Sequence, residues 1–292
     1  MAVHLVMRIT FLLLLTYELA EAAPPPIAKP SCPSRCGNVT EIPYPFGIGP
    51  KCYMDQSFEI VCNGTGSSAK AFLPSIDMEV LQINMSFRNY GFAYYPDDYY
   101  VYSSEPGLVR VNMPIISSNC TGSRNGAGVN MTGSPFYFSS RRNTFISVGC
   151  DNMALMTGID PMVVTGCKSD CDNESMTDQK CSGFNCCQTA VPEGIQVLNV
   201  DFKSIKGDKA SGECKHAWIA ESNRIAGIQV LNVVPVVLEW IATNETRGPN
   251  SYTAMTSYDQ YYYCCNRGFQ GNPYLPTGCE GKLQIRTALI FV

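Results

Sequence analysis

Fifteen cysteines are the feature that most constrains the fold of this 292-residue chain. How they are interpreted depends on the N-terminus, where Arg8 precedes an apolar run over residues 9–17 and the small residues Ala20 and Ala22 follow. The run is about half the ~20 residues that a membrane-spanning helix needs, so a signal peptide is predicted over residues 1–22. In a secreted chain, cysteines are interpreted first as disulfides. The sequence therefore predicts a secreted, disulfide-rich protein.

Fourteen cysteines are predicted to form disulfides, and the odd total leaves one without an internal partner. The vicinal pairs Cys186-Cys187 and Cys264-Cys265 are each expected to reach different partners, because a bond between adjacent cysteines is strained. The connectivity stays open. The predicted disulfide cysteines are Cys32, Cys36, Cys52, Cys62, Cys120, Cys150, Cys167, Cys171, Cys181, Cys186, Cys187, Cys214, Cys265 and Cys279.

Histidine is almost absent, since His4 lies in the predicted signal peptide and only His216 remains. Zinc sites of the Cys/His type and Ser-His-Asp triads are therefore not expected, and no metal site is predicted. No two acidic residues are expected to converge across a cleft as glycoside hydrolysis requires. The chain is accordingly interpreted as a non-catalytic protein with no catalytic residue and no cofactor.

Short apolar or alternating segments, separated by Gly, Pro, Asn and Ser, predict strands. Strands that recur with turns between them indicate antiparallel sheets. The predicted fold class is mainly β, with two disulfide-rich lobes of short antiparallel strands. The predicted strands cover residues 58–62, 80–87, 99–104, 108–113, 136–140, 144–150, 195–202 and 228–240.

The charge is uneven along the chain. Residues 24–150 carry nine Lys/Arg and eight Asp/Glu, whereas residues 151–292 carry eleven and fifteen. The first half is therefore neutral to slightly basic, which suits an anionic ligand. Arg141 and Arg142 stand together at a predicted turn, where guanidinium groups can capture carboxylates, although an ordinary solvated hairpin tip is the alternative.

Other candidate ligand residues extend this hypothesis. Arg88 and Arg110, with Lys51 and Lys70, can continue a cationic track. Tyr95 and Tyr99 lie in the aromatic segment 91–102, where alternation leaves some rings exposed for stacking on sugars. Packing within a sheet is the alternative for these tyrosines. Seven N-x-S/T sequons predict glycosylation at Asn38, Asn63, Asn84, Asn119, Asn130, Asn173 and Asn244.

Several cysteine-containing segments closely resemble the extracellular region of plant wall-associated receptor kinases. They are CPSRCGNVTEIPYPFGIGPKC (32–52), SPFYFS (134–139) with NTFISVGC (143–150), GCKSDC (166–171) and CSGFNCCQTAVP (181–192). GECKHAWIAE (212–221) and VVPVVLEW (233–240) resemble the cysteine-rich second segment of that family. CNRGFQGNPYLPTGC (265–279) is similar to the last loop of an EGF-like repeat.

The residue patterns, including a change in charge and cysteine density near Cys150, predict together with this resemblance a division into six segments. They are a signal peptide (1–22), a Pro-rich lead-in (23–31), a galacturonan-binding-like domain (32–150), a cysteine-rich second domain (151–250), a partial EGF-like repeat (251–280) and a truncated tail (281–292).

The resemblance also implies binding of pectin or oligogalacturonides in the cell wall. Family members are anchored in the plasma membrane and carry a kinase, but the Gly-rich loop, HRD and DFG motifs do not occur in this sequence. The expectation is a secreted ectodomain without kinase or transmembrane helix, with calcium involved only through the pectin ligand. Nucleic acid is not an expected partner. The alternative is a cysteine-rich interaction module or decoy for a receptor ectodomain.

Overall fold

The computed structural model describes residues 25–89, 103–120, 128–157, 164–171, 181–207, 214–222, 232–242 and 246–281. The predicted fold class is confirmed, because the described chain is built mainly from antiparallel strands. Its helical segments are two single 3-10 turns, Gln56–Phe58 and Gly66–Ser68. Among these residues, none of the helical segments has the length and apolar character of a membrane-spanning helix.

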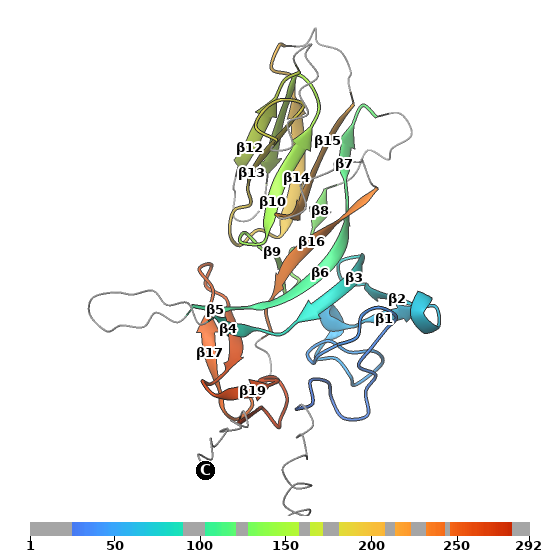
Figure 1. The fold of residues 1–292 in the computed structure, drawn as a ribbon, viewed down its shortest axis with the longest axis vertical. Helices are drawn as coiled ribbons and strands as arrows, with labels where there is room; N and C mark the ends of the chain where they lie inside the picture. Colours follow the sequence, from blue (N-terminus) through green and yellow to red (C-terminus); the bar gives the residue numbers. More distant parts are fainter. Residues whose placement is uncertain are drawn as a thin grey trace, which may run out of the picture.

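A six-stranded sheet crosses the middle of the molecule (Figure 1). In spatial order its strands are β1 (Val61–Asn63), β2 (Lys70–Leu73), β3 (Met78–Asn84), β6 (Gly107–Pro114), β16 (Val233–Trp240) and β9 (Phe136–Phe138). β16 pairs with β6 along its whole length, from Val233 opposite Pro114 to Trp240 opposite Gly107. A strand from the predicted second domain therefore completes the sheet of the predicted first domain. The domain boundaries themselves stay a prediction.

Two four-stranded sheets form the upper lobe in Figure 1. One contains β13 (Cys186–Ala190), β10 (Asn143–Val148), β15 (Lys215–Glu221) and β7 (Ile116–Ser118). The other contains β12 (Val164–Ser169), β11 (Asn152–Thr157), β14 (Val197–Lys203) and β8 (Val129–Asn130). Three two-stranded ladders complete the described fold: β4 (Phe87–Asn89) with β5 (Ser103–Glu105), β17 (Ser251–Met255) with β18 (Tyr261–Cys265), and β19 (Phe269–Gly271) with β20 (Cys279–Gly281).

Most of the core is one continuous apolar cluster with an aromatic centre, and a smaller cluster contains Ile241, Tyr262 and Cys264. Phe46 packs edge-on against Phe58 and Trp240, with ring centroids 5.1 and 5.4 Å apart. Edge-to-face contacts of this kind stabilise a core by about 0.5–1.5 kcal/mol beyond simple burial. The proline-containing segment 42–47 thus belongs to the core, and residues 44–45 form a turn within it.

The fourteen cysteines predicted to form disulfides do so, in seven pairs: Cys32–Cys52, Cys36–Cys62, Cys120–Cys214, Cys150–Cys171, Cys167–Cys187, Cys181–Cys186 and Cys265–Cys279. Cys186 and Cys187 reach different partners, as expected. Cys264 is buried and stays outside these seven bonds.

Most predicted strands coincide with observed ones, but one prediction is largely wrong. Of residues 58–62 only the last two belong to a strand, because Asp55 accepts a hydrogen bond from the backbone N–H of Ser57 at 2.8 Å and starts a 3-10 turn that ends at Phe58. Residues 99–102 and 228–231 of two other predictions lie outside the described residues. Strands such as β12, whose sequence is VTGCKS, were missed because they lack alternation.

Candidate ligand-binding cleft

A cleft lies where the central sheet meets the β17–β18 hairpin, and we call it the arginine cleft. It encloses about 70 Å³. Its walls come from residues 104–106 at β5, the turn 139–142 between β9 and β10, and residues 255–258 with Tyr262 from the hairpin. Arg141 and Arg142 therefore lie on one wall of a cleft and not on an isolated hairpin tip.

Asn143 fixes the turn that carries the two arginines. Its buried side-chain amide donates to the carbonyl oxygens of Ser139 at 2.8 Å and Val237 at 2.6 Å. Its Oδ1 accepts from the backbone N–H of Val237 at 2.9 Å. Since Val237 belongs to the central strand β16, the turn is tied to the most buried part of the sheet.

Both arginines face the same carboxylate. Nη2 of Arg142 lies 2.6 Å from Oε2 of Glu105, and Nη1 of Arg141 lies 4.0 Å from Oε1. The Glu105 side chain is only 12% exposed, whereas those of Arg141 and Arg142 are 58% and 43% exposed. An anionic ligand can therefore reach the guanidinium groups, but it has to compete with Glu105 for them.

A second carboxylate, that of Glu239, is buried below the arginine turn. Ser139 Oγ donates to its Oε1 at 2.8 Å and the Tyr258 hydroxyl donates to its Oε2 at 2.7 Å. Burial, together with this negative charge, raises the pKa of Tyr258 well above its ordinary value and keeps the hydroxyl a proton donor.

The cleft also brings together acidic residues that the sequence did not single out. Glu105, Glu193 and Glu239 all line the arginine cleft, so two arginines against three glutamates leave one net negative charge. Both oxygens of Glu105 face guanidinium groups and both oxygens of Glu239 accept hydroxyl hydrogen bonds. These two carboxylates therefore orient the neighbouring arginine, serine and tyrosine side chains.

A second pocket, of about 230 Å³, lies beside the first, and we call it the β9 pocket. Among its lining residues are Asp55 and Ser57, the segment 133–135 before β9, Tyr137 and Gln260, and none is Lys, Arg or His. The rings of Tyr137 and Tyr258 lie 4.9 Å apart, and Tyr137 lines this pocket while Tyr258 lines the arginine cleft. This tyrosine pair therefore separates two adjacent hollows.

The other predicted ligand residues are placed as follows. Arg110 lies on β6 two residues from Leu108, which lines the arginine cleft, so both face the same side of the strand. Its Nε lies 3.1 Å from Oε2 of Glu221. Arg88 lies opposite Ser104 in the β4–β5 ladder. Neither Arg110 nor Arg88 is a lining residue of the arginine cleft, whose two arginines are Arg141 and Arg142.

The remaining predicted contacts are two lysines and two tyrosines. Lys51 and Lys70 line neither of them, and Lys70 forms an ion pair of 3.1 Å with Glu79. Tyr95 and Tyr99 lie outside the described residues. Glu105, Glu239 and Tyr258 were missed in the sequence, where no local motif connects residues so far apart in the chain.

Five of the seven sequon asparagines lie within the described residues, and all five are exposed: Asn38, Asn63, Asn84, Asn119 and Asn130. Asn173 and Asn244 lie outside the described residues. A glycan needs an exposed asparagine, so the described positions leave room for the predicted modification.

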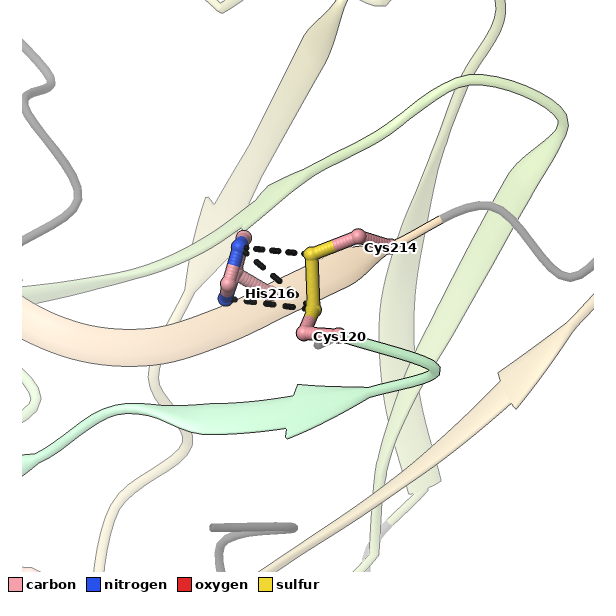
Figure 2. A group of neighbouring side chains, drawn as sticks. All are labelled: Cys120, Cys214 and His216. Atoms are coloured by element: carbon pink, nitrogen blue, oxygen red, sulfur yellow. Dashed lines mark hydrogen bonds between the residues drawn. A yellow bond between two sulfur atoms is a disulfide. The ribbon is translucent and has the colours of Figure 1, made fainter. Parts of the chain in front are cut away.

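The sole histidine of the predicted mature chain lies beside a disulfide, as Figure 2 shows. Nε2 of His216 is 3.0 Å from Sγ of Cys214 and 3.6 Å from Sγ of Cys120. This is a cluster of three potential metal ligands, which sequence reasoning did not expect. Since metals bind the thiolate form of cysteine and both sulfurs are bonded to each other, the imidazole is the only available donor of the three.

Comparison with known proteins gives two family matches. Residues 32–91 match the family described as wall-associated receptor kinase galacturonan-binding, and residues 178–246 match the family described as wall-associated kinase. No solved structure matches the chain.

Similar full-length proteins come from Arabidopsis thaliana. Wall-associated receptor kinase-like 6 is 31% identical over 298 residues, covering 85% of this chain and 44% of the relative. Wall-associated receptor kinase-like 4 is 32% identical over 324 residues, covering 92% of this chain and 39% of the relative. The chain thus spans less than half the length of these relatives.

Proposed function

Because the chain belongs to the wall-associated receptor kinase family, we propose that it is a non-catalytic extracellular protein that binds pectin as homogalacturonan or oligogalacturonide fragments. The proposal extends to secretion after removal of residues 1–22, location in the cell wall, and glycosylation at the exposed sequons. A cysteine-rich interaction module for a receptor ectodomain remains the competing hypothesis.

One observation carries the proposal. The segment that matches the galacturonan-binding family contributes Met54, Asp55, Ser57 and Phe58 to the β9 pocket, which adjoins the arginine cleft across the Tyr137–Tyr258 pair. Two adjacent hollows suit a ligand several sugars long. Hydroxyl and amide groups lie in one hollow, and carboxylate-binding arginines lie in the other.

The charges of the protein favour capture of single ligand carboxylates at the arginine cleft over long-range attraction of a polyanion. Residues 32–91 carry four Lys/Arg and five Asp/Glu, a net charge of −1, so long-range steering of a polyanion is not expected from this segment. A uronate carboxylate can instead replace Glu105 at Arg141 and Arg142 and form charge-assisted hydrogen bonds of the same kind. Single contacts of this type are weak, and a polymer gains affinity by engaging several at once.

The test is a titration of the purified glycoprotein with oligogalacturonides of increasing length, at low and high salt and with or without calcium. The double variant Arg141→Gln/Arg142→Gln is expected to bind at least about 10-fold more weakly, since two charge-assisted contacts are lost. Lys70→Gln is the matched control, because Lys70 lines neither hollow.

The proposal requires affinity that rises with chain length and falls with salt. Calcium is expected to act through gelled pectin, and its effect should be the same in both variants. Absence of binding under all these conditions would overturn pectin as the ligand. Equal affinity of the double variant and the control would remove the arginine cleft from the proposal.

A further inference from the structure

Cys120–Cys214 differs from the other disulfides in accessibility. All fifteen cysteines lie within the described residues, and Cys214 is the only exposed one among them. Each of the other six bonds joins sulfurs of buried or half-buried residues. A thiolate reacts with a disulfide by direct contact with one sulfur, so access to Cys214 favours attack at this bond.

His216 adds a chemical reason. Ser117 Oγ lies 2.8 Å from Nδ1 of His216, and Nε2 faces both sulfurs (Figure 2). If the serine hydroxyl donates to Nδ1, the neutral imidazole carries its proton on Nε2 and directs it at the sulfurs. An N–H donor in this position stabilises the thiolate that leaves when the disulfide is attacked.

We propose that Cys120–Cys214 is a thiol–disulfide exchange site, whose partner is a dithiol reductant and in which His216 positions and stabilises the leaving Cys120 thiolate. One thiolate of the reductant attacks Cys214 Sγ, the Sγ–Sγ bond breaks, and a mixed disulfide forms at Cys214. The second thiolate of the reductant then attacks the reductant sulfur of that mixed disulfide. This step releases Cys214 as a thiolate. Two electrons and two protons pass to the cysteines, and the reductant becomes a disulfide.

The strands that the bond connects are also held by backbone pairing. β7 and β15 remain joined by their ladder, in which Lys215, His216 and Ala217 lie opposite Ser118, Ser117 and Ile116. β15 also pairs with β10 over six positions. Reduction is therefore expected to open a local tether between the two strand ends while the sheet stays intact.

The test is graded reduction of the folded protein with dithiothreitol, followed by alkylation with iodoacetamide and peptide mapping. Cys120 and Cys214 are expected to be labelled at least about 10-fold faster than any other disulfide cysteine, with an unchanged far-UV spectrum. His216→Phe should slow this labelling several-fold, and Ser117→Ala should slow it less, through loss of the tautomer preference. Each labelling rate is compared with the labelling rate of Cys265 and Cys279 in the same sample. A general loss of stability would change both rates, whereas a local effect changes only the first.

Earlier labelling of another pair would overturn the exchange site. Loss of the far-UV spectrum on reduction would show that the bond is structural. If Cys120 and Cys214 are labelled at unchanged rates in both variants, His216 has no role in the exchange. Ser117→Ala is included because it tests the same contact with a smaller change to the fold.

Discussion

Glu105 shows how a single residue can set the affinity of the arginine cleft. It holds Arg142 at 2.6 Å and lies 4.0 Å from Arg141, so it orients both guanidinium groups and at the same time occupies them. A carboxylate ligand has to exchange with it, and the free energy of that exchange is the difference between two similar ion pairs. Removing the Glu105 charge changes this balance in favour of the ligand.

The variant Glu105→Gln is therefore expected to raise oligogalacturonide affinity several-fold, because two cations lose their internal counter-charge while the side chain keeps its size. The measurement is calorimetric titration at low salt, with Glu79→Gln as control, since Glu79 pairs with Lys70 and lines neither hollow. Weaker binding by Glu105→Gln would mean that Glu105 serves mainly to orient the arginines.

The same residues show what a sequence can and cannot predict about a site. Arg141 and Arg142 stand out because two guanidinium groups at a predicted turn suggest carboxylate binding. Glu239 lies about a hundred residues further along and reaches the cleft only because β16 inserts between β6 and β9. Asn143 likewise acts through Val237, whose pairing no local pattern predicts. The chemistry of each side chain can be read from the local sequence. Which side chains meet in the cleft depends on the pairing of strands that are far apart in the chain.

At the scale of elements, the close approach of β6 and β16 depends on Gly107. A Cβ atom at this position would lie 2.0 Å from Cε2 of Trp240, whose ring is fully buried. The Trp240 indole N–H also donates to the Asn84 carbonyl oxygen at 3.2 Å, so the ring links β16 to β3 across β6. A shift of the indole would disturb the aromatic contact that it makes with Phe46.

Gly107→Ala is thus expected to destabilise the protein by about 1–3 kcal/mol or more, as overpacking of a well-packed core does. Urea unfolding followed by Trp fluorescence measures the effect. Gly281→Ala in β20 is the control, because a Cβ atom there meets nothing within 4 Å. Equal stability of the two variants would show that β16 can shift away from β6.

The β17–β18 hairpin is the element expected to respond to alkaline pH. Burial raises the pKa of Tyr262 to about 12, against an ordinary value of 10.0, although a hydrogen bond with Ser104 Oγ acts in the opposite direction. The folded state thus prefers the protonated hydroxyl. This contribution to stability is complete below about pH 10 and is lost as the pH rises toward about 12.

Tyr262→Phe should therefore show a smaller loss of unfolding free energy than the unchanged protein between about pH 9 and about pH 12. Tyr261→Phe is the control, because Tyr261 is exposed on the same strand and both variants experience the same base chemistry. Parallel pH curves for all three proteins would contradict the assignment.

At the scale of the whole molecule, the order of the strands bears on the predicted domains. The cysteine and turn patterns correctly indicate a mainly β, disulfide-rich chain, since these properties depend on composition and spacing. A boundary at residue 150 follows from the change in charge and cysteine density. The central sheet crosses that boundary, because β16 lies between β6 and β9 and pairs with both. Strand order of this kind leaves no trace in local sequence.

The fragment 25–157 is therefore expected to lack a stable fold, because removal of β16 leaves β6 and β9 with unpaired edges and exposes Val109, Val111 and Phe136. Without Trp240, Phe46 and Phe58 also lose a shared aromatic neighbour. The measurement is urea unfolding of the fragment, with binding of a hydrophobic dye at low urea. The control is the same fragment refolded oxidatively together with residues 158–281, which restores every described strand and should unfold cooperatively. Cooperative unfolding of the fragment alone would instead establish residues 32–150 as an independent domain.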